Sequence, residues 1–250
     1  MADEGPVTED RLPSPQTGVI RHRSYSMLLA LDTATRQLSL ALHDGLSVAA
    51  EHSWRAGQHA TVELAPQAAL LMRRAGVEPA SLRGIAVALG PGSYTGLRIG
   101  LGLAKGLALA HNLPLVGVPT GDILMRAQAP RAHHARAVLQ AGRGRVLVLP
   151  YQWNSQHERW EADGGARVLT WEALAGEIAG PTLVCGEIDE AGRDALRALK
   201  GQALLAAPAF SLRRAGFLAE IGWERIRAGQ TDDPLRLAPL YGHAPEGAAA

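Results

Sequence analysis

The sequence predicts an α/β fold, and three observations lead to this prediction. Strand-like segments between residues 27 and 54 turn back on themselves at Asp44-Gly45, a dipeptide typical of hairpins. The segment that follows has apolar residues at helical spacing. Strand-like and helical segments then alternate along the chain. Three antiparallel strands followed by alternating helices and strands indicate a sheet with helices packed on it.

The elements are expected in the following order. Strands are predicted at 27–32, 37–43 and 46–54, a helix at 59–75, a strand at 84–89, a helix at 95–111 and a strand at 114–118. A helix at 121–129, a hairpin of strands 136–140 and 145–151, a helix at 171–179, a strand at 182–185, a helix at 189–199 and a strand at 203–206 follow. The last helix is predicted at 211–228, with an extended segment at 236–241.

Composition narrows the classes of function. A net charge of +1 argues against binding a polyanion by bulk electrostatics. Cys185 is the single cysteine, which excludes internal disulfides and suits a reducing cytosol. Arg98 and Lys105 interrupt the best apolar run before it reaches the length of a membrane span. We therefore expect a cytoplasmic protein without a membrane association.

The stretch from Gly90 to Ala108 organises the chain, because it joins a buried strand to a glycine-rich helix that Ser93 or Thr95 can cap. Each glycine inside a helix costs about 1 kcal/mol relative to alanine, so a packing reason is needed. The glycines and alanines form two rows at spacing i, i+4: Gly96, Gly100, Ala104 and Ala108, and then Gly102, Gly106 and Ala110. The two rows predict two close-packed faces on this helix.

A glycine loop before a helix can also bind phosphate. However, a Walker A loop ends in Gly-Lys-Ser/Thr, whereas here Gly96 precedes Leu97-Arg98. The dinucleotide motif needs G-x-G-x-x-G, and the spacing of Gly92 and Gly96 is one residue too long. We favour packing over a phosphate contact for these glycines.

The motif Gly-Pro-Gly-Ser-Tyr-Thr-Gly-Leu-Arg-Ile-Gly at 90–100, continued at 104–108 and 113–118, resembles the TsaB (YeaZ) family. These are the bacterial partner subunits in threonylcarbamoyladenosine modification of tRNA. The segments 29–35 and 38–42 resemble the same family, as does His59. The resemblance extends well over residues 27–150 and is weak beyond them.

The resemblance implies a two-lobed actin-like (ribonuclease H-like) fold, in which each lobe is a mixed sheet flanked by helices. The expected divisions are a disordered tail at 1–26, an N-terminal lobe at 27–119 completed by the helix at 211–228, a second lobe at 120–210 and a C-terminal extension at 229–250.

The resemblance also implies a non-catalytic, activating subunit of the complex that transfers a threonylcarbamoyl group to N6 of adenosine 37 in tRNAs reading ANN codons. Its expected partners are a TsaD-like transferase subunit, a TsaE-like ATPase and, through the complex, tRNA, with a homodimer when the chain is alone. ATP and metal are expected on the partner subunits. The expected interface comprises His59, Glu63, Gly96, Gly100, Gly102, Ala104 and Gly106.

The alternative is a free-standing enzyme of the same fold, an ATPase, kinase or peptidase that uses Asp32. Actin-like enzymes place a phosphate- and magnesium-facing aspartate at the end of the first strand, but their glycine-rich loop is replaced here by Thr33-Ala34-Thr35. Asp32, Thr33, Ser93 and Thr95 therefore form at best a degenerate nucleotide loop, and a local cap explains Asp32 equally. His59 and Glu63 have metal-ligand spacing, but the sequence contains no His-x-x-x-His, so no metal site is expected.

A basic stretch between Ile123 and His157 holds five arginines and no acidic residue. Arg136, Arg143 and Arg145 are therefore candidates for contact with the tRNA backbone, although a solvated surface explains them as well. The chain departs from the family here, where relatives often have Asp-Ala-Arg and this chain has Gln140-Ala141-Gly142. It also has Gly242-His243 after Tyr241, where relatives tend to end on Pro-x-Tyr-x-Arg.

Overall fold

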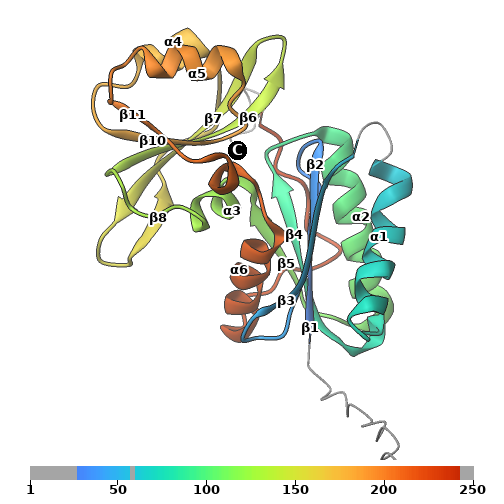
Figure 1. Cartoon of the computed structure of the whole chain (residues 1–250). Helices are drawn as coiled ribbons and strands as arrows, with labels where there is room; N and C mark the ends of the chain where they lie inside the picture. Colours follow the sequence, from blue (N-terminus) through green and yellow to red (C-terminus); the bar gives the residue numbers. More distant parts are fainter. Residues whose placement is uncertain (1–26, 57–59, 243–250) are drawn as a thin grey trace, which may run out of the picture.

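The computed structural model describes residues 27–56 and 60–242, which form two lobes (Figure 1). The first lobe contains a five-stranded sheet in the order β3-β2-β1-β4-β5. Its strands are β1 (Met27–Asp32), β2 (Gln37–His43), β3 (Val48–Arg55), β4 (Leu82–Gly90) and β5 (Leu115–Pro119). The first three strands pair antiparallel, whereas β4 pairs parallel to β1 and β5 pairs parallel to β4.

Helices cover both faces of this sheet, because successive residues of β1 point to opposite sides. Leu29 and Leu31 join one core, while Leu28 and Ala30 join the other. Helices α1 (Ala60–Arg74) and α2 (Tyr94–His111) pack on the first side, and α6 (Ala215–Arg227) packs on the second (Figure 1).

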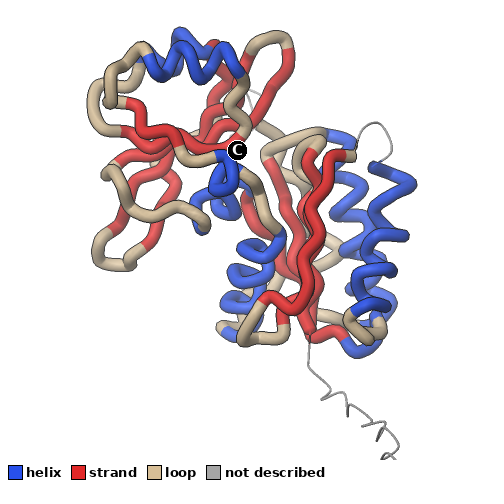
Figure 2. The backbone as a smooth tube through the Cα atoms, viewed as in Figure 1, coloured by secondary structure: helices blue, strands red, loops and turns tan. Residues whose placement is uncertain are grey.

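The second lobe is built on a sheet in the order β11-β10-β6-β7-β8, with β9 paired to β7. Its strands are β6 (His134–Gly142), β7 (Arg145–Asn154), β8 (Arg159–Ala162), β9 (Arg167–Thr170), β10 (Thr182–Gly186) and β11 (Ala203–Leu205). The helices α3 (Thr120–Arg126), α4 (Trp171–Gly176) and α5 (Glu190–Arg197) flank it (Figure 2). Both lobes thus combine parallel and antiparallel strands.

A C-terminal strap, defined here as residues 229–242, runs back over the first lobe. The Asp232 N–H donates to the Leu115 carbonyl at 2.8 Å, and the Leu240 N–H donates to the Leu89 carbonyl at 2.7 Å. Gly242 approaches Leu147 of the second lobe. The strap therefore follows β5, at the edge of the sheet, towards the start of α2.

Several predicted boundaries are corrected by the structure. The third strand begins at Val48 rather than residue 46, because the Asp44 carboxylate accepts the Leu46 and Ser47 N–H groups and holds a turn there. The last helix begins at Ala215 rather than residue 211, because an extended segment separates it from a 3-10 turn at Pro208–Ser211. The helices expected at 121–129 and 171–179 end at Arg126 and Gly176. Strands β8 and β9 were not predicted.

Candidate functional site

The inner row of glycines on α2 packs against the turn between β1 and β2. A Cβ atom at Gly96 would lie 2.2 Å from the Thr33 carbonyl oxygen, and one at Gly100 would lie 2.2 Å from Thr33 Oγ1. The Thr33 hydroxyl donates to the Gly96 carbonyl at 2.7 Å. Ala104 lies in the same row and is fully buried. These members of the expected interface therefore serve the core of their own lobe.

The outer row of α2 faces solvent. A Cβ atom at Gly102 or Gly106 would meet nothing within 4 Å among the described residues. The expectation of two close-packed faces is thus met on one face only within residues 27–56 and 60–242. The glycines that face outward are Gly102 and Gly106, which the sequence alone did not distinguish from Gly96 and Gly100.

Tyr94 and Arg98 extend the outer row by two further steps of four residues. The Arg98 guanidinium lies 3.9 Å from the Tyr94 ring centre, a cation–π geometry. Its Nε donates to the hydroxyl of Tyr241 at 3.0 Å, and the Tyr94 and Tyr241 rings stack at 5.1 Å. The strap thereby fixes an aromatic and cationic anchor at the start of the outer row.

Helix α1 lies beside α2 (Figure 1), and it also exposes apolar side chains. Val62 is 68% exposed, and Ala65, Pro66 and Ala69 are exposed further along the helix. We call these four residues, together with Gly102, Gly106, Leu109 and Ala110, the outer helix face. Glu63 is half-buried and accepts a hydrogen bond from Trp54 Nε1 at 2.9 Å, whereas His59 lies outside the described residues.

Asp32 ends β1 at the junction of the two lobes and is fully buried. Its Oδ1 accepts the Ala34 N–H at 2.9 Å, as a local cap does. Its Oδ2 accepts Nε of Arg213 at 3.1 Å. Both carboxylate oxygens are therefore engaged within the protein.

Arg213 connects Asp32 to the second lobe, and its side chain is 1% exposed. Its NH1 group donates to Glu187 at 3.1 Å and its NH2 group donates to the Gln37 carbonyl at 3.0 Å. The Thr35 hydroxyl, which NH2 also contacts, donates to Glu187 at 2.6 Å. Burial raises the pKa of Glu187, but the Arg213 charge and the hydrogen bonds from Thr35 and Gln140 outweigh burial, so the pKa lies below its ordinary value.

Gln140 donates its backbone N–H to Glu187 Oε2 at 3.0 Å and its side-chain amide to the Glu187 carbonyl at 3.0 Å. The same amide reaches Asp189 at 3.2 Å. A carboxylate at position 140 would face these acceptors without a proton to donate. Glutamine therefore suits position 140 better than aspartate would.

The loop between β4 and α2 is held by hydrogen bonds within the first lobe. Its Ser93 N–H donates to the Ala34 carbonyl at 2.6 Å, and the Gly96 N–H donates to Ser93 Oγ at 3.2 Å. Ser93, rather than Thr95, is thus the cap of the helix. Thr33 points its side chain at α2. Asp32, Thr33 and Ser93 of the candidate nucleotide loop therefore have hydrogen-bond partners within the protein, whereas Thr95 is exposed.

The three candidate arginines for tRNA contact are separated by the fold. Arg143 and Arg145 are exposed at the tip of the β6–β7 hairpin, where Arg143 has a φ of 55°. Arg136 lies nearer the other end of β6 and is half-buried, and it donates to the Ala135 carbonyl at 2.9 Å. Burial lowers its pKa, while Glu177 and Asp163 act in the opposite direction. Only the two hairpin arginines form a surface pair.

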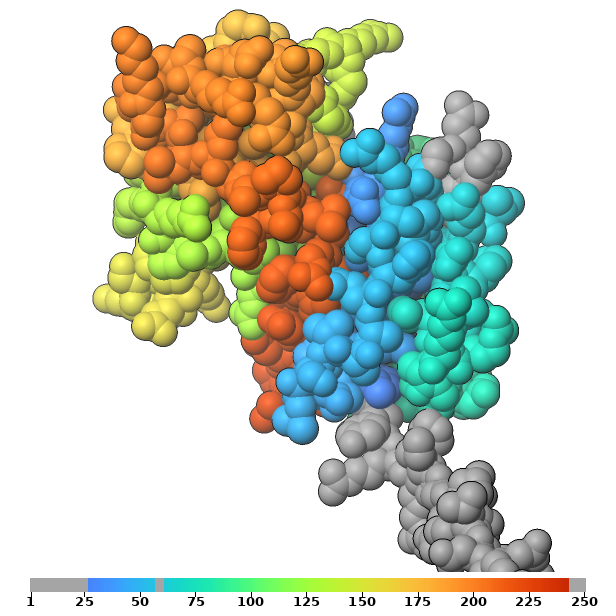
Figure 3. All heavy atoms as spheres, viewed as in Figure 1, coloured from blue at the N-terminus to red at the C-terminus, as the bar shows by residue number. Residues whose placement is uncertain are grey.

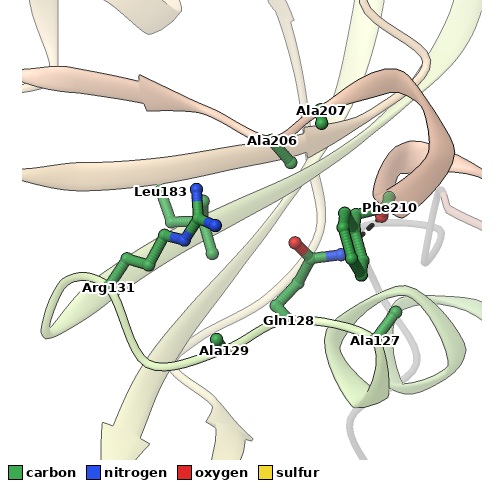
Figure 4. Close-up of a pocket in the computed structure, with 8 residues that line it drawn as sticks. All are labelled: Ala127, Gln128, Ala129, Arg131, Leu183, Ala206, Ala207 and Phe210. Carbon is green, nitrogen blue, oxygen red and sulfur yellow. Dashed lines mark hydrogen bonds between the residues drawn. The ribbon is translucent and has the colours of Figure 1, made fainter.

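Two hollows lie in or beside the second lobe. The smaller, of about 70 Å³, is lined mainly by alanines, Gln128, Arg131 and Phe210 (Figure 4). The larger, of about 790 Å³, lies between α3, α6 and the β7–β8 hairpin and contains the T-shaped pair Trp153 and Trp160. Its arginines are largely paired: Arg126 with Glu220 and Glu224, and Arg159 with Glu161.

Within residues 27–56 and 60–242, no three histidine, cysteine or acidic side chains are grouped so that they could hold a metal ion. Over the same residues, no helix has the length and apolar character needed to cross a membrane.

Two lobes, each with a mixed sheet and flanking helices, and with a strand-ending aspartate at their junction, define a two-lobed actin-like protein. Residues 54–167 match the family model described as TsaD: tRNA N6-adenosine threonylcarbamoyltransferase. The chain is similar to the tRNA threonylcarbamoyladenosine biosynthesis protein TsaB of Bacillus subtilis, at 30% identity over 84% of this chain and 94% of that protein. It therefore belongs to the TsaB (YeaZ) family.

Other relatives agree with this assignment. The Escherichia coli protein of the same name is 33% identical over 59% of this chain and 64% of that protein, so the match spans slightly less than two thirds of its length. The solved structure named YeaZ from Pseudomonas aeruginosa superposes with a TM-score of 0.68 at 27% identity, over 86% of this chain and 99% of that one. The resemblance inferred from the glycine motif and the two-lobed fold are both confirmed.

Proposed function

We propose that this chain is a non-catalytic, activating partner subunit in the transfer of a threonylcarbamoyl group to N6 of adenosine 37 of tRNAs that read ANN codons. Its membership of a family of threonylcarbamoyladenosine biosynthesis proteins supports this role. The observation that carries the proposal is the outer helix face, because two adjacent helices present small and apolar residues to solvent there.

The outer helix face is suited to close helix packing. Glycines on α2 let another helix approach its backbone, and Val62 and Leu109, which are 68% and 55% exposed, supply apolar area beside them. The proposed occupant is a helix pair of the related transferase subunit, a TsaD-like protein. A second copy of this chain takes its place when the partner is absent.

The remaining partners follow from the same assignment. A TsaE-like ATPase and tRNA join through the complex, and ATP and metal belong to the partner subunits. Asp32 supports this division of labour, because its carboxylate is engaged by Ala34 and Arg213. No observation favours the alternative of a free-standing enzyme. We place the reaction, and hence the chain, in the cytoplasm, where tRNA is modified.

The test compares leucine substitutions at three glycines. Gly102→Leu should leave the melting transition nearly unchanged but weaken binding to the TsaD-like subunit, because the side chain separates the two helices. Overpacking of this kind costs about 1–3 kcal/mol, or about a ten- to hundredfold loss of affinity. Gly100→Leu should instead unfold the chain, since a Cβ atom there already lies 2.2 Å from Thr33 Oγ1.

Gly176→Leu is the matched control, because Gly176 is an exposed residue at the end of helix α4 in the other lobe, where a Cβ atom would meet nothing within 4 Å among the described residues. It should fold and bind normally. Affinity is measured by calorimetry and complex formation by size-exclusion chromatography. If Gly102→Leu folds and binds the transferase subunit as tightly as the Gly176→Leu control, the outer helix face is not the interface.

A further inference from the structure

A buried arginine stands directly in front of Asp32. Arg213 is contributed by the segment that returns from the second lobe to α6, and an extended backbone at Leu212 and Arg214 turns its side chain inward. The guanidinium is enclosed by acceptors on both sides, with Asp32 and the Gln37 carbonyl in the first lobe and Glu187 in the second.

The charges explain why this cation is needed. Asp32 is fully buried, and three-quarters of the Glu187 side chain is removed from solvent. The carboxylates of Asp32 and Glu187 both contact the Arg213 guanidinium. Without a cation between them they would repel each other and would have lost hydration without compensation, so the cation stabilises the junction of the lobes. In an actin-like enzyme a metal ion in contact with phosphate supplies that positive charge in front of the aspartate. Here the chain supplies it with its own side chain.

The same arrangement joins the lobes. Arg213 forms hydrogen bonds to residues on both sides of the junction, and Thr35 of the first lobe donates to Glu187 of the second at 2.6 Å. The planar guanidinium has fixed donor directions, so these bonds constrain orientation as well as distance.

We propose that Arg213 is a built-in cation that replaces the metal and nucleotide of the fold: it excludes them from Asp32 and holds the two lobes in one orientation without a ligand. Removing it should therefore expose a latent cation site formed by Asp32, Glu187 and the Thr35 hydroxyl, an oxygen-donor set suited to a hard divalent ion. Removal should also loosen the lobes. This inference is independent of the proposed partner interface, which lies on the opposite face of the first sheet.

The first test measures binding of Mn²⁺ alone. The melting temperature of the Arg213→Met variant should rise with Mn²⁺ concentration, because an ion that binds only the folded state stabilises it. The wild type and the Arg214→Met control, which removes the neighbouring exposed arginine that pairs with Glu51, should not respond. Adding Asp32→Asn to Arg213→Met should abolish the response. A response in the wild type, or no response in Arg213→Met, overturns the latent-site part of the proposal.

The second test measures the lobes directly. Nitroxide labels on cysteines introduced at the exposed positions Leu46 and Gln156 report the distance between the lobes, while the native Cys185 is buried. The distance distribution should be narrow in the wild type and in Arg214→Met, and broad in Arg213→Met. Equal widths would overturn the orienting role.

If Arg213→Met does not fold alone, the Asp32→Asn/Arg213→Met double variant provides the distance measurement, because it leaves no unpaired charge at position 32. It should show a broad distribution without Mn²⁺ stabilisation. A distribution as narrow as that of the wild type in this double variant would overturn the orienting role of Arg213.

Discussion

Glycines of α2 that look alike in sequence have opposite roles in the structure. Gly96 is in contact with the Thr33 carbonyl, whereas Gly102 is exposed and has open space where a side chain would be. The helix therefore needs glycine at position 96 to fold, while glycine at position 102 only lowers the stability of the isolated chain. The cost at position 102 is understandable if the position serves binding.

The first prediction compares alanine at these two positions. Gly96→Ala should destabilise the protein by about 1–3 kcal/mol, because its methyl group would overlap a backbone oxygen that cannot move freely. Gly102→Ala should stabilise it by about 0.5–1 kcal/mol through helix propensity. Urea unfolding measures both. Equal effects of the two substitutions would contradict the assignment of inner and outer rows.

The second prediction concerns the loss of folding stability at acidic pH. The pKa of Glu187 lies below its ordinary value in the folded protein, so the folded state holds fewer protons on this group than the unfolded state near that value. Its contribution is fully present above the ordinary glutamate pKa and is lost as the pH falls through the lowered one. Glu187→Gln should flatten the decline of the urea midpoint over that acidic range. A Glu190→Gln variant, at the exposed start of α5, is the control.

At the scale of elements, the strap forms hydrogen bonds with the edge strand β5 that a further strand of the sheet would otherwise form. Strand β5 is the last in its sheet, and its Gly117 N–H is buried. Asp232 of the strap accepts that N–H at 2.8 Å and lies 3.7 Å from Arg225 of α6. The strap thus satisfies an edge group and ties the last helix to the sheet.

The third prediction tests this tie. Asp232→Ala should destabilise the fold by about 1–3 kcal/mol, because it leaves a buried N–H without an acceptor. Asp233→Ala, one residue away, removes an exposed carboxylate that accepts the Leu235 N–H at 2.8 Å and lies 3.6 Å from the exposed Arg236. Because both contacts are at the surface, its effect should be below about 0.5 kcal/mol. Thermal or urea unfolding distinguishes the two. Similar losses for both variants would show that the Gly117 contact contributes little.

At the scale of the whole molecule, the two lobes present different surfaces. The outer helix face belongs to the first lobe, whereas Arg143 and Arg145 are exposed at the tip of the β6–β7 hairpin of the second. The yellow-green segment that contains this hairpin projects at the top of the molecule in Figure 3. A subunit held by one lobe therefore leaves the other free for a weaker, electrostatic contact.

The fourth prediction is that this contact is with tRNA in the assembled complex. Arg143→Glu/Arg145→Glu should weaken tRNA binding and lower the slope of log affinity against log salt by about 1–2, as expected for two lost phosphate contacts. Arg197→Glu/Lys200→Glu makes the same change of charge elsewhere on the second lobe and should have a smaller effect. Identical salt slopes for the two double variants would exclude a hairpin contact.

Features that depend on neighbouring residues could be predicted from the sequence, whereas features that depend on residues far apart in the chain could not. Strands β1 and β2 begin and end where predicted, because β1 is apolar as far as Asp32 and leucines recur at every second position of β2, at 38, 40 and 42. Strands β8 and β9 are four residues each with no buried residue, so hydrophobic spacing does not reveal them. Arg213 and Asp32 are 181 positions apart, and no periodicity links them. The sequence predicts the row of Gly102 and Gly106. The same spacing of four residues could have extended that row back to Arg98 and Tyr94.

The order of the elements along the chain has a consequence for synthesis. Helix α6 covers the apolar side of the first sheet that includes Leu28, Ala86 and Val116, yet it follows the whole second lobe in sequence. During translation, which adds about 5–20 residues per second, this side of the sheet stays exposed until α6 has been synthesised and has left the ribosome. We therefore expect chaperones to bind the nascent first lobe. A ribosome-bound chain that stops before Ala215 should be captured by them far more than one that includes α6 and the strap.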